Sequence, residues 1–280
     1  MNRRELIASS TCLALSSLFA LPSHAADAES GWQPLFDGKS LDGWRFYQEG
    51  IGDIDKLGAV SIERGGILHF LPPAYSGESA PPGHISTVAE WENYHLRLDF
   101  RYGETRWPPR KLQRRNSGIL YHMGPETDRL FPDCVEFQLE EGDVGDAIMV
   151  NTLGLQGPSL GGTPLWPNWI PAFPSDYQTP VKAGAYSRQW HRHSGEYERL
   201  DDWNRIDLYA FGDQAAHLVN GRIVNTIFQM LKTDRDGNKT PLTKGRIALE
   251  MEWAEVMFRN VMIRPLDKNA IGRIKSQGSD

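Results

Sequence analysis

Strict two-residue alternation of apolar and polar side chains is the feature that most limits how this chain can fold. In YHLRLDFRY, Tyr94, Leu96 and Leu98 fall on one side of an extended chain, whereas His95 and Arg97 fall on the other. A half-buried β-strand has this pattern, and no amphipathic helix of three turns interrupts the series. The pattern predicts an all-β sandwich of two antiparallel sheets. The runs that show it are 59–63, 67–71, 84–88, 94–102, 117–123, 133–140, 205–211, 214–219, 222–227, 245–251 and 255–264.

Two short sequences predict tight hairpins between these strands. Asn220 and Gly221 join two apolar runs in HLVNGRIVN, and both residue types accept the positive φ angles of a two-residue turn. Gly65 and Gly66 join 59–63 to 67–71 in the same way. No low-complexity linker divides the chain, so we expect one domain over residues 26–280. A net charge of −6 gives no reason to expect nucleic acid or an anionic membrane as a partner.

The first residues have the features of a secretory signal peptide. Basic Arg3 and Arg4 precede an apolar stretch, and small residues surround Ala25. The stretch is too short for a membrane span, so we expect residues 1–25 to be removed and the mature protein to be periplasmic or secreted. The two arginines also fit a twin-arginine export signal. Cys134 would then have no disulfide partner, and we expect it to be a small buried hydrophobic residue.

A long loop insertion is expected at residues 154–202, which are rich in Pro, Gly and aromatic side chains and lack a sustained period. Trp166, Trp169 and Trp190 lie in this stretch. One interpretation is that their indoles form a wall against the apolar face of a sugar. The alternative is that they pack together and anchor the loop.

The stretch PDCVEFQLEEGDVGDAIMV carries more acid than an ordinary buried strand. If it is extended, Val135 and Phe137 face the core, whereas Glu136, Gln138 and Glu140 share the opposite face. That face must be concave or wet, because an unpaired buried carboxylate costs several kcal/mol.

Two further segments predict polar side chains on the same face. In NSGILYHM, Asn116 and His122 fall on one side of the strand, and the RIALEMEW segment places Glu250 and Glu252 two residues apart. If these strands are neighbours, their polar residues form the floor of a groove. The alternative is a solvated outer sheet face with incidental charges.

The residues that carry these patterns also resemble a known family. The segments GWQPLFDGKSLDGWRFY, NSGILYH, VEFQLEEGDVGD, DDWNRIDLYAFGDQAAHLVNG and GRIALEMEWAEVMFRNVMIRPL are similar, in the same order, to the 3-keto-disaccharide hydrolase family. The resemblance covers nearly the whole mature chain. It implies a concanavalin A-like jelly-roll fold with the ligand groove on the concave sheet, and a carbohydrate as the substrate.

The resemblance also implies a chemistry. A ketone at C3 of a sugar makes the hydrogen on C2 acidic, so a base can remove it, and the group on C1 then leaves before water adds. The site needs a base, a donor to the enolate oxygen and an acid. We expect Glu136 or His122 to be the base, Asn116 or Gln138 the donor, and Glu250 or Glu252 the acid.

Two other functions remain open. A conventional glycosidase of the laminarinase type is disfavoured, because Glu136 and Glu140 are four residues apart, roughly 13 Å along a strand, whereas the carboxyl groups of a retaining enzyme lie about 5 Å apart. A carbohydrate-binding domain without catalysis would use the same groove. Calcium is a possible cofactor, because Glu140, Glu141, Asp143 and Asp146 cluster near two glycines, although a solvated acidic turn is the simpler interpretation. No His or Cys cluster indicates zinc.

Overall fold

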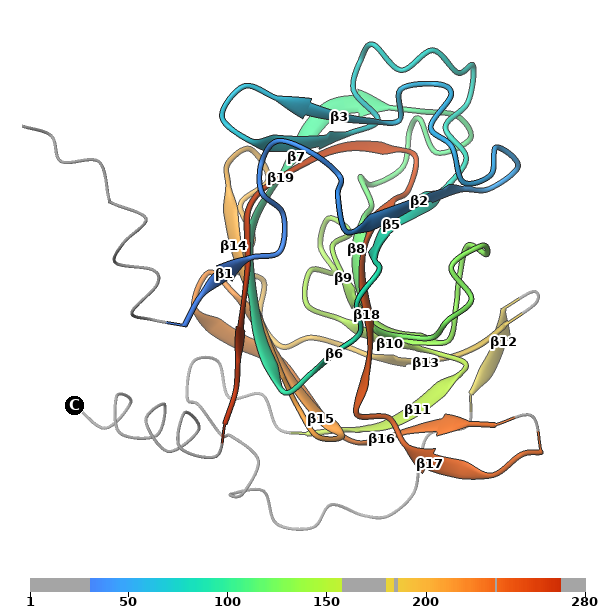
Figure 1. The fold of residues 1–280 in the computed structure, drawn as a ribbon, viewed down its shortest axis with the longest axis vertical. Coiled ribbons are helices and arrows are strands. Elements are labelled where there is room, and N and C mark those ends of the chain that lie inside the picture. Colours follow the sequence, from blue (N-terminus) through green and yellow to red (C-terminus); the bar gives the residue numbers. More distant parts are fainter. Residues whose placement is uncertain (1–30, 158–179, 184–185, 235, 268–280) are drawn as a thin grey trace, which may run out of the picture.

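The computed structural model describes residues 31–157, 180–183, 186–234 and 236–267, and these form two antiparallel β-sheets without a helix. The predicted signal peptide, Trp166 and Trp169 lie outside the described residues. Within them, no helix is present that could cross a membrane. In Figure 1 the two sheets lie face to face, with β14 (Asn204–Phe211), β7 (Tyr94–Arg106) and β19 (Ala254–Pro265) in one layer and β9 (Cys134–Gln138), β8 (Gly118–Met123) and β18 (Lys244–Met251) in the other. The expected concanavalin A-like jelly-roll sandwich of two antiparallel sheets is confirmed.

The first sheet has β14, β7 and β19 at its centre. Its order is β11 (Thr152–Gln156), β16 (Arg222–Thr233), β15 (Gln214–Val219), β14, β7, β19, β4 (Ile67–Phe70) and β3 (Val60–Glu63), with β1 (Gln33–Pro34) on β19 and β17 (Lys239–Pro241) on β16. Asn220 and Gly221 form the predicted hairpin between β15 and β16, with φ angles of 49° and 81°. A side chain with a Cβ branch would strain either position.

The second sheet carries the segments that the sequence singled out. Its order is β12 (Val181–Ala183), β13 (Tyr186–His191), β10 (Ala147–Val150), β9, β8, β18, β5 (Gly83–Thr87) and β2 (Trp44–Gln48), with β6 (Trp91–Glu92) on β18. β9 therefore lies between β8 and β10, and β8 separates β9 from β18.

The expectation of a continuous loop at 154–202 needs correction, because β12 and β13 lie within it and extend the second sheet. The alternation in YSRQWH places Tyr186, Arg188 and Trp190 on one face of β13. The strand is short and lies in a Pro- and Gly-rich segment, so its two-residue alternation is too brief to be recognised in the sequence. Its pairing with β10 is a tertiary contact that local propensity does not predict.

The core fills the space between the sheets. Val135, Phe137 and Leu139 are fully buried in it, as the alternation of β9 predicted. A smaller apolar cluster lies on the opposite face of the second sheet and contains Leu120, Met123, Cys134, Ile148, Val150 and Ala248. Cys134 is a free, buried thiol within this cluster, as expected of a small hydrophobic residue.

Candidate active site

A groove with a volume of 370 Å³ lies on the face of the second sheet that points away from the core. β9 supplies its centre, because Glu136 and Gln138 alternate with the core residues Val135 and Phe137. The predicted orientation of this strand is therefore observed. The residues that line the groove are Arg110, Asn116, Phe131, Glu136, Gln138, Glu140, Ile148, Val150, Tyr186, Arg188, Trp190, Glu252 and Trp253.

Glu136 and Glu250 approach each other across Gly118. The glycine belongs to β8, which separates β9 from β18. A Cβ atom at position 118 would lie 2.8 Å from Oε1 of Glu136 and in steric conflict with Oε2 of Glu250. The absence of a side chain at Gly118 therefore leaves space for two carboxyl groups side by side.

Glu250 lies beneath the groove rather than in its wall. Its side chain is fully buried, neither of its carboxyl oxygens has a hydrogen-bond partner among the described residues, and the carboxyl group of Glu136 lies beside it. Burial, followed by the charges of Glu136 and Glu252, raises the pKa of Glu250 well above its ordinary value. Burial and the charge of Glu252 raise the pKa of Glu136 as well, although Arg188 opposes this effect. These carboxyl groups cannot all be ionised at neutral pH.

Glu252 faces the groove at the end of β18. An isolated bridge joins it to Asn116, and the Asn116 side-chain amide donates a hydrogen bond to Oε2 of Glu252. Nη1 of Arg110 lies 3.8 Å from the same oxygen. Burial raises the pKa of Glu252 to about 7, while Arg110 opposes the shift and Glu140 adds to it. Glu252 is thus poised to exchange a proton near neutral pH.

An apolar strip runs beside the carboxyl groups. Ile148 and Val150 of β10 face the groove, with Ile148 opposite Glu136 on one side and Trp190 on the other. Phe131 and Tyr186 form a wall, with their ring centroids 4.7 Å apart. The groove therefore has a carboxyl side and an apolar side, which suits the two kinds of surface on a sugar ring.

Trp190 lines the groove between two cations. Arg188 shares a face of β13 with Trp190, and Arg192 follows the strand. The guanidinium carbons of Arg188 and Arg192 lie 4.9 and 4.4 Å from the indole centroid. Its Nε1 atom donates to Asp146. These contacts leave the indole less open to stacking than the sequence suggested, and they make it a support for Arg188.

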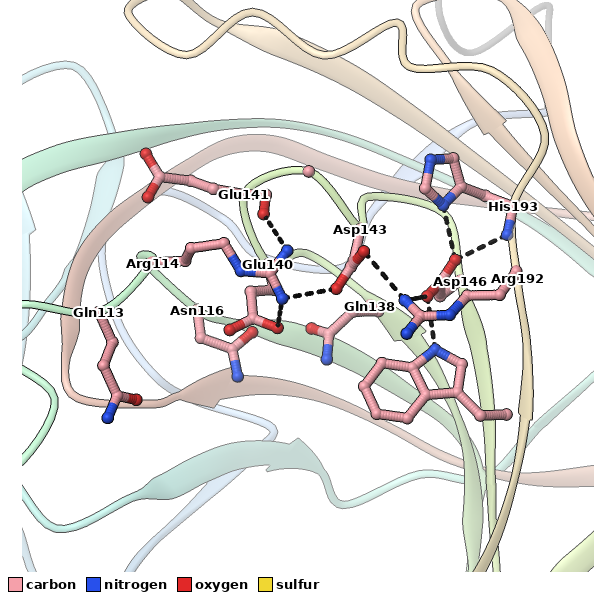
Figure 2. Close-up of polar contacts among 12 residues, drawn as sticks. Gln113, Arg114, Asn116, Gln138, Glu140, Glu141, Asp143, Asp146, Arg192 and His193 are labelled. Atoms are coloured by element: carbon pink, nitrogen blue, oxygen red, sulfur yellow. Dashed lines mark hydrogen bonds and ion pairs between the residues drawn. The ribbon is translucent and has the colours of Figure 1, made fainter.

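Arginines pair with the acidic turn after β9 (Figure 2). Arg114 contacts Glu140 at 3.0 Å and Asp143 at 2.7 Å, and Arg192 contacts Asp143 at 3.0 Å and Asp146 at 2.9 Å. In the same turn, Arg115 pairs with Glu141. Each carboxylate thus has a cation beside it. Among the described residues, no three His, Cys, Asp or Glu side chains are grouped so that they could hold a metal ion. This arrangement does not fit the calcium site that the acidic spacing raised.

Asp146 is the most enclosed carboxylate of this turn. Nδ1 and the backbone N–H of His193 both lie 2.6 Å from its Oδ1. Burial alone would raise the pKa of Asp146, but the bonds from His193 and Trp190 outweigh it and lower that pKa. The same bond raises the pKa of His193. Asp146 thereby holds the C-terminal end of β13, from Trp190 to His193.

His122 is not part of the groove floor, and its predicted convergence with Asn116, Glu136 and Gln138 is wrong. The pairing between β8 and β18 shifts register at this point, and His122 has a φ angle of 49°. This bulge reverses the alternation, so Met123 joins Leu120 on the groove side. The imidazole contacts the rings of Tyr94 and Tyr121, and burial lowers its pKa to about 3.

The groove also contains residues that the sequence did not single out: Arg110, Phe131, Tyr186, Arg188 and Trp253. Tyr186, Arg188 and Trp190 occupy alternate positions, and this pattern could have indicated that they share one face of a strand. Arg110 lies in the segment before β8, which has no period, so only the tertiary structure could place it.

A larger hollow of 760 Å³ lies beside β2. Its charged residues Arg45, Asp53 and Asp128 are all exposed to solvent. Because exposed groups keep their hydration, this hollow offers less to acid–base chemistry than the smaller groove.

Comparisons with known proteins place the fold and the site in context. Residues 31–264 match the family model described as a 3-keto-alpha-glucoside-1,2-lyase-like domain, in agreement with the resemblance noted in the sequence. None of the curated proteins matches this chain.

Solved structures resemble it in fold. A crystal structure of a proposed glycosyl hydrolase from Parabacteroides distasonis ATCC 8503 has 20% identity, covers 88% of this chain and 99% of its own, and gives a TM-score of 0.51. A second such protein from that organism has 21% identity, covers 84% of this chain and 99% of its own, and gives a TM-score of 0.47. The carbohydrate-binding module CBM66 from Bacillus subtilis has 10% identity, covers 79% of this chain and 95% of its own, and gives a TM-score of 0.42.

Proposed function

The chain belongs to the family of 3-keto-alpha-glucoside-1,2-lyase-like domains, and we propose that it cleaves 3-keto-glycosides or 3-keto-disaccharides by elimination followed by hydration. Family membership supports a carbohydrate-related function. The finer proposal depends on one observation: three buried carboxyl groups are neighbours, because Glu136 and Glu252 line the groove and Glu250 lies beneath it. Such a cluster is costly for stability and is typical of acid–base sites.

Glu252 is the proposed base. Arg110 and the amide of Asn116 favour its ionised form, and its pKa of about 7 leaves a large ionised fraction at neutral pH. In the proposed reaction the Glu252 carboxylate takes the proton from C2, and the electrons of that bond form the enolate with the C3 ketone. Because it faces the groove, it is accessible to a bound sugar.

Glu136 is the proposed acid, a role that we first expected for Glu250 or Glu252. It lines the groove, and burial and the charge of Glu252 raise its pKa, which favours its protonated form. The enolate electrons return to form the double bond between C1 and C2, the bond from C1 to the leaving oxygen breaks, and Glu136 gives that oxygen its proton. Glu250, which lies behind Glu136, is a positioning residue that disfavours loss of this proton. Water then adds to C1 of the enone.

A conventional retaining glycosidase needs two carboxyl groups about 5 Å apart, both within reach of the sugar. Glu136 and Glu250 are close, but Glu250 is fully buried and does not line the groove. Glu140 is held by Arg110 and by Arg114. Neither is therefore well placed as a nucleophile, although this function remains the second candidate.

One experiment separates the three functions. The purified protein is incubated with a 3-keto-glucoside and, separately, with the unoxidised glucoside. We expect cleavage of the keto form alone, slowed when deuterium replaces hydrogen at C2 because that bond breaks in the first step. Cleavage of the unoxidised sugar would favour the glycosidase, and saturable binding without cleavage of either would favour a carbohydrate-binding domain.

Export is a separate proposal that depends on the predicted signal peptide at residues 1–25. We expect the mature chain to begin near Ala26 in the periplasm or outside the cell. N-terminal sequencing of the protein from cell fractions checks this, and an intact Met1 in the cytoplasmic fraction would contradict it.

A further inference from the structure

Arg188 differs from the other cations around the groove. Arg110 bonds to Gln113 and Glu140, and Arg192 pairs with Asp143 and Asp146. By contrast, the described residues provide no hydrogen bond or ion pair for the Arg188 guanidinium group, which lines the groove and lies 4.9 Å from the centroid of the Trp190 ring. A guanidinium group has five N–H donors. Those of Arg188 are therefore available to a ligand in the groove.

The distance from Arg188 to the carboxyl groups leaves room for one sugar ring. Val150 lies opposite Arg188 in one direction and opposite Cys134 of β9 in the other, whereas Ile148 connects Trp190 to Glu136. Two strand spacings separate β13 from β9, roughly 10 Å. Arg188 therefore lies diagonally across the apolar strip from Glu136, near enough for its charge to act on that carboxyl group. A sugar ring can rest on the strip with the carboxyl groups on one side and the guanidinium group on the other.

The proposed elimination requires a donor at the C3 oxygen, where negative charge develops. Of the two amides that the sequence suggested, Asn116 donates to Glu252, and Gln138 accepts the N–H of Leu139 at 2.8 Å through its side-chain oxygen. Their remaining N–H groups are neutral donors, whereas a charged donor forms the stronger hydrogen bond to an oxyanion. A guanidinium group loses less hydration than an ammonium group when it binds, and its fork can hold an oxyanion through two N–H groups.

We propose that Arg188, supported by Trp190, is a catalytic residue that donates hydrogen bonds to the C3 ketone oxygen and stabilises the enolate. This inference depends on the proposed function, because it assigns the remaining role in that reaction. The proton moves from C2 to Glu252, the charge forms on the C3 oxygen, and Arg188 keeps its own protons throughout.

Rates test the role directly. Arg188→Met keeps the apolar stem and removes the charge, and kcat on a 3-keto-glucoside should fall about 10²- to 10³-fold, as for loss of one oxyanion donor. The kcat of Arg188→Lys should lie between those of Arg188→Met and the original enzyme, because lysine keeps the positive charge but lacks the forked pair of N–H donors. Arg222→Met is the control, since Arg222 is exposed on β16 of the other sheet. Added guanidinium ion, at concentrations far below those that denature the protein, should partly restore Arg188→Ala and leave Arg222→Ala unchanged.

Binding distinguishes failure of this inference from failure of the proposed function. Calorimetry in the Glu136→Gln background compares the keto sugar with its unoxidised parent. We expect the keto sugar to bind more tightly, and Arg188→Met to remove that preference while the parent binds as before. A kcat within threefold of the original enzyme, or equal weakening of both sugars, would overturn the role of Arg188. A folded protein that prefers neither sugar and turns over neither would overturn the proposed function as well.

Discussion

Glu136 and Glu250 lie against the two sides of Gly118, so a residue without a side chain is what allows two carboxyl groups to meet, one lining the groove and the other beneath it. β8 places this glycine between the strands that carry them. The arrangement places two carboxyl groups side by side in a buried position, which proteins rarely do without a functional reason.

Replacing Gly118 should impair catalysis more than folding. In Gly118→Ala the new methyl group meets the flexible ends of Glu136 and Glu250, which can move at modest cost, so we expect about 1–3 kcal/mol of destabilisation. The displaced acid should lower kcat at least tenfold. Thermal unfolding and turnover of a 3-keto-glucoside measure the two effects. Gly124→Ala is the control, because its methyl group would meet the flexible end of the exposed Glu126 and would touch Asp133 only at ordinary contact distances of 3.5 and 3.9 Å. Equal activity of both variants would argue against a shared role of the two carboxyl groups.

Neighbouring residues of β9 should separate chemistry from stability. Glu136→Gln keeps the shape and removes the transferable proton, so turnover should fall about 10²- to 10⁴-fold while substrate binding changes little. Val135→Ala on the core face should instead cost about 1–3 kcal/mol through lost burial and a cavity. Its folded fraction should retain full turnover. Normal activity of Glu136→Gln would remove this residue from the reaction.

The pH dependence of the rate should report Glu252. As a base it must be ionised, and its pKa is about 7. The rate should therefore rise with pH and level off above that value. Arg110→Met removes a cation that lowers this pKa, so the rise should move to higher pH. Arg114→Met serves as the control, because Arg114 pairs with Glu140 and Asp143. A rise that stays in place in Arg110→Met would assign it to another group.

Stability should increase when Glu250 loses its charge. The pKa of Glu250 is raised in the folded state. Between the pKa of the unfolded state, about 4.3, and the higher pKa of the folded state, the folded protein binds more protons than the unfolded chain. Stability therefore declines as pH rises through this range. Glu250→Gln removes this decline, and its amide can donate to Glu136. We expect a higher Tm than the original protein at pH 8, the same Tm near pH 4, and lower kcat. A lower Tm at pH 8 would show that Glu250 is structurally required.

The Asp146–His193 pair should stabilise the protein in mildly acidic solution. The raised pKa of His193 gives stability below about pH 6.5 that is lost as pH rises through the folded value, whereas the lowered pKa of Asp146 gives stability above about pH 3.9. In urea unfolding, His193→Gln should therefore lose most stability relative to the original protein between these values, for example at pH 5.5. At pH 9 the difference should be small. A loss that does not vary with pH would indicate packing rather than charge.

Much of this architecture follows from local pattern. Two-residue alternation determined which residues of β9 enter the core, because side chains of an extended strand must point to opposite faces. It predicted the buried Val135 and Phe137 and the opposing Glu136 and Gln138, whereas the Asn220–Gly221 pair between two apolar runs predicted the hairpin. The family resemblance also came from the sequence.

The tertiary structure decided what that pattern could not. A bulge moved His122 into the core, since one irregular φ angle reverses every later side chain in the strand. Pairing of β13 with β10 brought Arg188 into the groove from a segment expected to be a loop. Which carboxyl groups share protons depends on strand order, because Glu136 and Glu250 are far apart in sequence and become neighbours only where β8 presents Gly118 between them.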